Sequence, residues 1–507
     1  MGSSLEGTPL TEKLVSGTGT PTQPGLVVGL DLGTSGLKAI AINAEGTVVA
    51  RASASYPTHR PEAGASEQDP ADWIHAIKSA VRDLQNDTND APWISIGLSG
   101  MLPTLVTIDA RNETNGHAIT WEDARADEYG ESLRTQLGEE LVYRTTGQWV
   151  DGRYLLPMWA RLVDVEPTRA NTTSMLLGAK DFIFGWLTGQ FVTDPSTATG
   201  FGCYALEERA WDAQFVQRIV QSPAGTVPSL PQIESSQFGA NILASIAHEL
   251  NVSSDVTVCL GAADSVLGAT GMGSNHNGNI AYVGGTSTII LGVTDELKFD
   301  ADHRYLITPM AEPGMWGVEM DLLSTGSSFR WLANLTGSEE SDMMQLAQAG
   351  AEVGGPIFLP YLAPGEQGAL WDPTISGSLH GLNLTHTVAD ISRALADGIV
   401  IESVRCVDAL TDNGFLAGPI LVSGGSANHS WFRQRLSDAC RRVVITGGGD
   451  EPDRSALGAA LVAARAIGLQ VDVDIQRGES LSPDAARADL WTQKVAAFNA
   501  LLQKAQK

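Results

Sequence analysis

The stretch Val28-Gly29-Leu30-Asp31-Leu32-Gly33-Thr34-Ser35-Gly36-Leu37-Lys38-Ala39-Ile40 decides how this chain folds. Two apolar runs flank a tight Asp-x-Gly-Thr-Ser-Gly turn, whose glycines permit backbone geometry and close approach that a side chain would prevent. Backbone N–H groups in such a turn can converge on a phosphate, with the hydroxyls of Thr34 and Ser35 as further donors, and Asp31 can hold a hydrated divalent cation. A plain β-hairpin is the alternative interpretation, because Gly-Thr-Ser turns are common.

A second copy of this pattern lies far downstream, at Ile280-Ala281-Tyr282-Val283-Gly284-Gly285-Thr286-Ser287-Thr288-Ile289-Ile290-Leu291. Val283 stands where the first copy has Asp31. Two similar phosphate loops predict a duplicated protein with two lobes. The difference at the acidic position predicts that one lobe supplies a carboxylate facing a metal ion, whereas the other supplies only amides and hydroxyls.

The length and charge of the chain limit its class. Its 507 residues predict two large domains of about 200 to 250 residues each. With 32 basic and 59 acidic side chains the net charge is -27, which argues against nucleic acid or an anionic membrane as the main partner. The same charge repels a nucleoside triphosphate at long range, so an ATP site here needs local donors and a metal ion.

The cysteines and the apolar runs indicate the compartment. The four cysteines are scattered, with no Cys-x-x-Cys pair and no histidine at metal-binding spacing, which predicts reduced, buried thiols. No apolar run approaches the roughly 20 residues of a membrane span, and the N-terminus lacks the basic and then apolar pattern of a secretion signal. We therefore expect a cytoplasmic protein.

The order of the expected elements indicates an α/β fold. Residues 1–24, rich in Gly, Ser, Thr and Pro, are expected to form a disordered N-terminal arm. Strands are predicted at 37–42 and 47–54 around a glycine-ended turn, and a helix is predicted after Asp69-Pro70. Further strands at 93–98 and 105–108 give the alternation of an α/β layer, in which ligands bind near strand ends.

Asp264 follows a short apolar strand predicted at 256–260, and the small residues around it leave room for a ligand. An N-cap aspartate is the alternative, but the position just before the second glycine turn favours a function.

A third glycine turn, Ser423-Gly424-Gly425-Ser426-Ala427-Asn428, joins a strand predicted at 420–422 to a helix at 431–440. One such turn is a weak indication of a nucleotide, but a third in a two-lobed chain adds to it. The turn Gly447-Gly448-Gly449 and a helix at 455–467 are expected to close the second lobe.

Taken together, Gly29-Leu30-Asp31-Leu32-Gly33-Thr34-Ser35, Gly261-Ala262-Ala263-Asp264, Gly284-Gly285-Thr286-Ser287-Thr288 and Ser423-Gly424-Gly425-Ser426-Ala427 resemble the sugar kinases of the FGGY family. The resemblance implies an α/β protein with two ribonuclease-H-like domains of the actin and sugar kinase superfamily, and a cleft between them for ATP and substrate. The implied units are an N-terminal domain at 25–274, a C-terminal domain at 275–468 and a helical tail at 469–507.

The resemblance also implies roles for single residues. Asp264 matches the catalytic base, and Asp31 matches the acid associated with Mg²⁺. The residues implied to bind ATP are Gly33, Thr34, Ser35, Lys38, Gly285, Thr286, Ser287, Gly424, Gly425 and Asn428. Those implied on the substrate side are Met101, Leu102, Trp121, Asp123, Lys180 and Asp264.

The substrate side is similar to xylulokinase-type and gluconokinase-type members at residues 121–125 and at Lys180-Asp181, although the residues alone favour helix N-termini there. Met101-Leu102-Pro103 replaces the Gln-Met-His usual in xylulokinases, which removes polar contacts to sugar hydroxyls. A ketopentose is the expected substrate. Gluconate, with Lys180 or Arg125 near its carboxylate, or a polyol is the alternative.

Two other functions fit the same loops. An actin-like or chaperone-like ATPase would hydrolyse ATP without a sugar, and a non-catalytic sugar sensor would have lost Asp31 or Asp264, both of which are present. The expected partners are ATP and a small sugar or sugar acid, with neither nucleic acid nor membrane. The oligomeric state stays open, with a homodimer among the alternatives.

Overall fold

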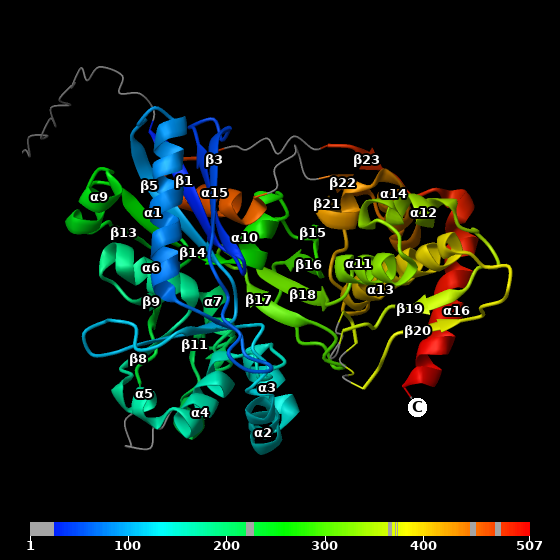
Figure 1. Ribbon diagram of the computed structural model, residues 1–507, viewed down its shortest axis with the longest axis horizontal. Coiled ribbons are helices and arrows are strands. Elements are labelled where there is room, and N and C mark those ends of the chain that lie inside the picture. Colours follow the sequence, from blue (N-terminus) through cyan, green and yellow to red (C-terminus); the bar gives the residue numbers. More distant parts are fainter. Residues whose placement is uncertain are drawn as a thin grey trace, which may run out of the picture.

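The computed structural model describes residues 25–219, 228–363, 368–370, 372, 374–446, 453–471 and 478–506. Two lobes lie side by side, with the N-terminal half on the left in Figure 1 and most of the C-terminal half on the right. The expected arm at residues 1–24 and the turn Gly447-Gly448-Gly449 fall outside the described residues.

The N-terminal lobe is built on a six-stranded sheet with the order β13-β14-β5-β1-β2-β3. β1 runs antiparallel to β2 and parallel to β5. All seven residues of β1 are buried, as expected of a central strand that is covered on both faces. The strands are β1 (Leu26–Leu32), β2 (Gly36–Ile42), β3 (Val48–Ser55), β5 (Trp93–Gly100), β13 (Gly239–Asn241) and β14 (Thr257–Ala263).

Helix α1 (Pro70–Asp87) covers one face of this sheet. It begins where the sequence predicted, because the Asp69 side chain accepts a hydrogen bond from the Ala71 N–H and Pro70 takes the first helical position. Its apolar side, which includes Trp73 and Leu84, packs into the same hydrophobic core as Val28.

The C-terminal lobe has a seven-stranded sheet with the order β17-β18-β16-β15-β21-β22-β23. Its central order β22-β21-β15-β16-β18 repeats β14-β5-β1-β2-β3, with an antiparallel hairpin first and a parallel neighbour beside its first strand. The duplication predicted from the two glycine turns is therefore a duplication of the whole sheet. The strands are β15 (Ile280–Gly284), β16 (Thr288–Thr294), β17 (Leu306–Pro309), β18 (Trp316–Leu322), β21 (Ile420–Ser423), β22 (Val444–Thr446) and β23 (Ser480–Leu481).

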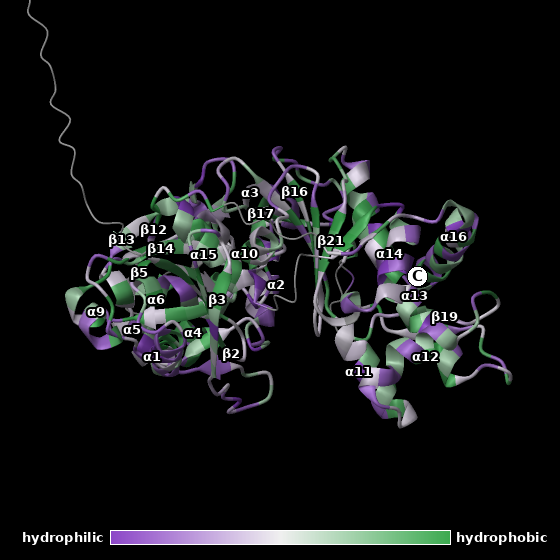
Figure 2. Cartoon of the chain, turned by 90° about the horizontal axis from the view of Figure 1, so that it is seen from above, coloured by the Kyte–Doolittle hydropathy of each residue, from purple (hydrophilic) through white to green (hydrophobic). Residues whose placement is uncertain are grey.

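Helices pack around the second sheet, and the longest is α13 (Val388–Asp412), which begins with a capping box between Thr387 and Asp390. The other elements of this lobe are α11 (Gly326–Thr336), α12 (Met343–Ala349), β19 (Ile357–Leu359), β20 (Ser378–His380), α14 (Ser430–Cys440) and α16 (Ala488–Ala505), with the 3-10 turns η1 (Glu340–Asp342), η2 (Gly425–Asn428) and η3 (Ala485–Arg487). In Figure 2 the sheets, for example β21, are green, whereas outer helices such as α2 are largely purple.

Helix α15 (Arg454–Ala466) differs from the expectation that it closes the second lobe. It packs on β1, β5 and β14 of the N-terminal sheet and against α10 (Asp264–Gly271). The contact is backbone to backbone: a Cβ at Gly29 would lie 1.8 Å from the Ala456 carbonyl oxygen, and one at Gly458 would lie 2.0 Å from that of Leu267. The α10 and α15 pair therefore joins the two halves of the chain.

A further segment of the N-terminal lobe lies outside the six-stranded sheet. It contains a four-stranded sheet with the order β4-β7-β6-β8. Its strands are β4 (Glu67–Gln68), β6 (Thr104–Ile108), β7 (Ala118–Thr120) and β8 (Met175–Leu177). The helices and short strands around it are α2 (Asp127–Leu137), α3 (Glu139–Thr146), α4 (Leu155–Val165), α5 (Pro167–Thr172), α6 (Ala179–Thr188), β9 (Val192–Thr193), α7 (Pro195–Thr199), β10 (Tyr204–Ala205), β11 (Ala210–Trp211), α8 (Ala213–Ile219), β12 (Gln232–Ile233) and α9 (Ala244–Leu250).

Across the ranges that the structure describes, no helix combines the length and the apolar character needed to cross a bilayer.

Candidate active site

A cavity of about 300 Å³ is lined by residues of both lobes. Its wall includes Thr34 from the first glycine turn, Ser287 from the second, and Asp264 at the start of α10. The other lining residues are Leu102, Pro103, Trp121, Gln148, Arg153, Tyr154, Thr199, Gly200, Ser265, Ile289, Leu306, Thr308, Glu319, Asp321 and Leu323. We call this cavity the cleft.

Both glycine turns are hairpin turns, so the plain hairpin and the phosphate loop describe the same local structure. The Gly33 N–H donates to the Gly36 carbonyl at 3.1 Å between β1 and β2, and the Gly285 N–H donates to the Ser287 carbonyl at 2.7 Å between β15 and β16. Behind the second turn, the Gly326 N–H at the start of α11 donates to the Gly285 carbonyl at 3.2 Å. The two turns therefore face the cleft from opposite lobes.

The third glycine turn lies beside the second one, because β21 pairs in parallel with β15. Gly424 and Gly425 have φ values of +74° and +46°, which only glycine adopts readily. A Cβ at Gly424 would lie 2.4 Å from the Gly284 carbonyl oxygen. Asn428 ends the 3-10 turn that follows, where its carbonyl accepts a hydrogen bond from Arg433.

Asp264 is placed in the cleft by the step from β14 to α10, where its Oδ1 accepts a hydrogen bond from the Ser265 N–H at 2.8 Å. Burial, together with the negative charges of Asp31 and Asp321, raises the pKa of this carboxyl to about 7, against the opposing effect of the Ser265 N–H. A carboxyl that titrates near neutral pH can accept a proton during a reaction.

Asp31 stands at the end of β1, only 8% exposed, and its Oδ1 accepts a hydrogen bond from the Ser99 hydroxyl at 2.7 Å. Burial raises its pKa, although Ser99 and the Lys38 ammonium oppose the shift. Lys38, opposite Asp31 in the hairpin, forms an ion pair of 3.5 Å with Asp453.

The acids around Asp31 fit a divalent cation. The negative charge of Asp31 raises the pKa of Asp264, an effect that a nearby cation would relieve, and carboxylate oxygens are the ligands that Mg²⁺ prefers. In the part of the chain that the structure describes, no group of three or more His, Cys, Asp or Glu forms a metal cage. Asp31 is the residue that would hold such an ion, through water and together with phosphate oxygens.

The substrate-side residues inferred from the sequence separate into two groups. Leu102 and Trp121 line the cleft together with Asp264, and the Trp121 indole N–H donates to the Thr34 hydroxyl at 3.0 Å. Met101 lies in the hydrophobic core of the N-terminal lobe and is only 2% exposed. Neither Asp123 nor Lys180 is among the lining residues.

Asp123 and Lys180 are buried in ion-pair networks. Asp123 accepts hydrogen bonds from the Ser66 N–H at 2.9 Å and from Arg125. Lys180 lies 2.9 Å from Asp181 and 3.2 Å from Asp194, with its side chain 1% exposed. The charges of Asp123 and Lys180 are therefore already paired within the protein.

Sequence reasoning missed several polar residues of the cleft wall, among them Gln148, Arg153, Glu319 and Asp321. Gln148 and Arg153 carry no local pattern that would mark them. The strand β18 did carry a signal, since Trp316-Gly317-Val318-Glu319-Met320-Asp321-Leu322 alternates apolar and acidic positions. That period of two predicts a strand with one buried face and one acidic face.

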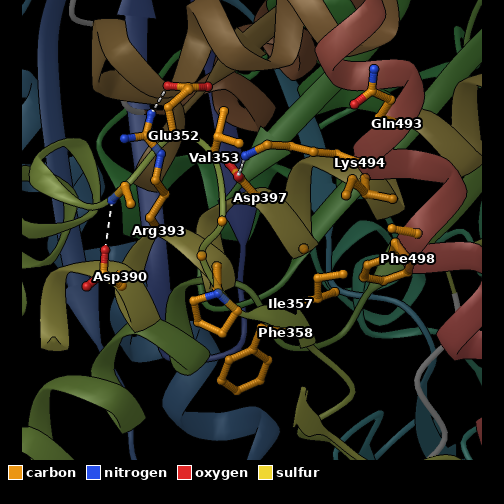
Figure 3. A pocket seen from close by; sticks show the side chains of 18 of the residues that line it. Glu352, Val353, Ile357, Phe358, Asp390, Arg393, Asp397, Gln493, Lys494 and Phe498 are labelled. Carbon is orange, nitrogen blue, oxygen red and sulfur yellow. Dashed lines mark hydrogen bonds and ion pairs between the residues drawn. The ribbon is translucent and has the colours of Figure 1, made fainter. Parts of the chain in front are cut away.

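A second cavity, of about 200 Å³, lies within the C-terminal lobe between α13, α16 and the segment before β19, and shares no lining residue with the cleft. Figure 3 shows that its charged side chains face one another: Arg393 pairs with Glu352, and Lys494 pairs with Asp397. The Lys494 pair joins α16 to α13, and the Arg393 pair joins α13 to the segment before β19. The two glycine turns and the candidate base meet at the cleft instead.

Curated relatives and solved structures share this architecture. A xylulose kinase of Staphylococcus xylosus is 27% identical over 86% of this chain and 90% of its own length, and a gluconokinase of Bacillus subtilis is 25% identical over 87% and 88%. The structure of a xylulose kinase from Rhodospirillum rubrum superposes with a TM-score of 0.87 at 27% identity, covering 94% of this chain and 98% of the other. A gluconate kinase from Lactobacillus acidophilus, with a TM-score of 0.88 at 23% identity, covers 95% and 98% and shows the same fold.

The fold and the cleft are therefore those of a two-domain sugar kinase of the ribonuclease-H-like superfamily. Residues 26–271 match the N-terminal domain, and residues 280–467 the C-terminal domain, of the FGGY family of carbohydrate kinases. The chain belongs to this family, so it is a phosphotransferase with an alcohol group as acceptor, and ATP is the phosphoryl donor of the family.

Proposed function

We propose that this chain phosphorylates a ketopentose with ATP, using Asp264 as the general base. One observation carries the proposal: Thr34, Ser287 and Asp264 line a single cleft, which brings both glycine turns and the Asp264 carboxyl to the same space. The xylulose kinases among the relatives support the choice of sugar.

In this mechanism Asp264 accepts the proton of the sugar hydroxyl as that oxygen attacks the terminal phosphorus in line. The raised pKa of Asp264 matches the task, since a base that titrates near the working pH combines availability with basicity. Ser265 N–H holds the carboxyl in position. In this arrangement the sugar lies beside Trp121 and Asp264 and the phosphates lie at the glycine turns, with the attacking and leaving oxygens on opposite sides of the transferred phosphoryl group.

The glycine turns bind the phosphates. Backbone N–H groups of both turns, with the hydroxyls of Thr34, Thr286 and Ser287, stabilise the charge that spreads over the transferred group. Asp31 would hold Mg²⁺ through water, together with the phosphates, and the bound ion would supply positive charge that offsets the charge of the phosphates. Gly424, Gly425 and Asn428 hold the adenosine, since their turn adjoins the second phosphate loop.

Gluconate is the second candidate, and Arg153 favours it as the one cation among the residues that line the described cleft. The Arg153 guanidinium is already engaged by Asp151, at 2.7 Å between Nη2 and Oδ2. Lys180 and Arg125, the other cations considered for a sugar acid, are held in their own ion pairs.

The test is ATP consumption with Mg²⁺ across D-xylulose, L-xylulose, D-ribulose, L-ribulose, gluconate, glycerol and erythritol. We expect one ketopentose to raise the rate far above the others. Equal ATP consumption with every sugar would instead support an actin-like ATPase, and a response to gluconate alone would support the second candidate.

A further inference from the structure

The C-terminal lobe presents a pair of carboxylates to the cleft. Glu319 and Asp321 are two residues apart on β18, so their side chains leave the same face of the strand. Val318, Met320 and Leu322, on the opposite face, are at most 2% exposed in the hydrophobic core. The buried face fixes the register, so the two acids cannot turn away from the cleft.

Other residues of the protein supply only some of the hydrogen bonds that the carboxyl groups of Glu319 and Asp321 can accept. The Ser265 hydroxyl donates to Glu319 Oε2 at 3.3 Å, which links the residue after Asp264 to the opposite lobe. Asp321 Oδ1 is buried and has no hydrogen-bond partner among the described residues. Leaving a buried carboxylate oxygen without a donor is costly, so a ligand hydroxyl is the natural partner in a cavity that Asp321 itself lines.

The charge of the cleft wall selects among ligands. Three acidic side chains, those of Asp264, Glu319 and Asp321, stand against one guanidinium, that of Arg153, which Asp151 already binds through both carboxylate oxygens. Burial and the charges of Asp321 and Asp264 raise the pKa of Glu319, and burial raises that of Asp321 to about 6 against the attraction of Arg153. An anionic ligand would bind either against this negative charge or with uptake of a further proton, whereas the hydroxyl groups of a neutral ligand can donate to ionised oxygens and accept from protonated ones.

We propose that Glu319 and Asp321 form the specificity wall of the cleft, binding the hydroxyls of an uncharged polyhydroxy substrate and rejecting sugar acids. The inference rests on the proposed function in that it takes the cleft as the sugar site, and it names the substrate class: neutral ketoses and polyols. Selectivity of this kind comes from repulsion of the wrong ligand as well as attraction of the right one.

Equilibrium binding without ATP tests the wall apart from the reaction. Isothermal titration would compare the pentitols xylitol, ribitol and D-arabinitol with the matching pentonates, which differ only by a carboxylate at one end. We expect the parent protein to bind its best pentitol at least about 10-fold more tightly than the matching pentonate, from the usual strength of hydrogen bonds to charged groups. In the double variant Glu319→Gln and Asp321→Asn this ratio should fall towards one, because amides do not repel the pentonate.

The variants also separate a specificity role from a structural one. Each single change should raise the KM of the sugar by about 10-fold or more with the KM of ATP unchanged. Glu340→Gln removes the same charge from the exposed 3-10 turn η1 and is the matched control, with no expected effect on either KM. Thermal melting shows whether each variant folds.

Any of three results would contradict the proposal that Glu319 and Asp321 form a specificity wall. These are a parent protein that binds a pentonate as tightly as its pentitol, a ratio unchanged in the double variant, or a cleft that binds none of the six ligands. If the pentitol preference held but no sugar was phosphorylated, the proposed function would fail while this inference stood. If a ketopentose was phosphorylated but the ratio stayed the same in the double variant, the proposed function would stand and this inference would fail.

Discussion

The indole N–H of Trp121 donates to the hydroxyl of Thr34 at 3.0 Å, so the wall expected to hold the sugar is bonded directly to the first glycine turn. The Gln68 amide supports the same turn by donating to the Thr34 carbonyl at 2.7 Å. In the proposed mechanism, placement of the substrate and of the phosphates is therefore coupled through one side chain. A substitution at Trp121 should therefore affect phosphate binding, and a substitution at Thr34 should affect sugar binding.

A double-mutant cycle measures this coupling. Trp121→Phe keeps an aromatic wall but removes the donor, and Thr34→Val removes the acceptor. We expect each to lower kcat/KM for the sugar, and the double variant to show a coupling free energy of about 0.5 to 1.5 kcal/mol, the usual net value of one hydrogen bond. Additive effects would show that the bond carries no part of the placement.

Asp264→Asn should remove most of the rate and little of the binding. General-base catalysis typically contributes about 10²- to 10⁴-fold, so we expect a loss of that size in kcat with sugar and ATP affinities kept within a few-fold. Steady-state kinetics and titration calorimetry measure the two parts. Glu249→Gln, an exposed acid paired with Lys78, is the control, and near-parental turnover of Asp264→Asn would contradict its role as base.

The pH profile should have an acidic limb near neutrality. Asp264 accepts a proton only as a carboxylate, and its pKa of about 7 means that kcat/KM falls as the pH drops below that value. Because Asp321 raises the pKa of Asp264, Asp321→Asn should move the limb to lower pH. A limb near pH 4, the range of a solvated carboxyl, would contradict the assignment.

Ionisation of the Asp264 carboxyl should lower the free energy of unfolding at high pH. The folded-state pKa of Asp264 is raised above its unfolded value of 3.8, so the folded state binds the proton more tightly and loses stability as the pH rises towards about 7. Asp264→Asn should therefore raise the free energy of unfolding at pH 8 by about 1 to 3 kcal/mol, and have little effect near pH 4. Thermal midpoints at the two pH values measure this, and a variant less stable than the parent at pH 8 would refute it.

In the contact between α10 and α15, the position of Gly458 should tolerate no side chain. In Gly458→Ala the new Cβ would lie 2.0 Å from the Leu267 carbonyl oxygen, on the backbone, so α15 must move away from α10. We expect a loss of about 2 kcal/mol or more in unfolding free energy, together with reduced activity. Gly355→Ala, whose Cβ would make an ordinary contact of 3.5 Å with the Ala351 carbonyl oxygen, is the control, and equal stability of both variants would show that the helices can separate without cost.

Much of the fold was contained in local sequence patterns. The paired glycine turns predicted two related lobes, and the structure confirms them as two sheets with the same central strand order. The start of α1 was also predicted, because an Asp cap followed by proline fixes a helix start through neighbouring atoms alone. The roles given to Asp31, Asp264 and the glycine turns stay predictions for the experiments above.

The sequence by itself determined the hairpin turns and the start of α1, since each depends on residues close together in the chain, and it indicated the family through four short motifs that can each be recognised locally. Only the tertiary structure decided that α15 packs on the first lobe, that Lys180 and Asp123 are buried in ion pairs, and that Glu319 and Asp321 face Asp264 across the cleft. The reason is physical. Which charges neutralise each other, and how closely two backbones approach, depends on segments far apart in the chain that meet only once both sheets are formed.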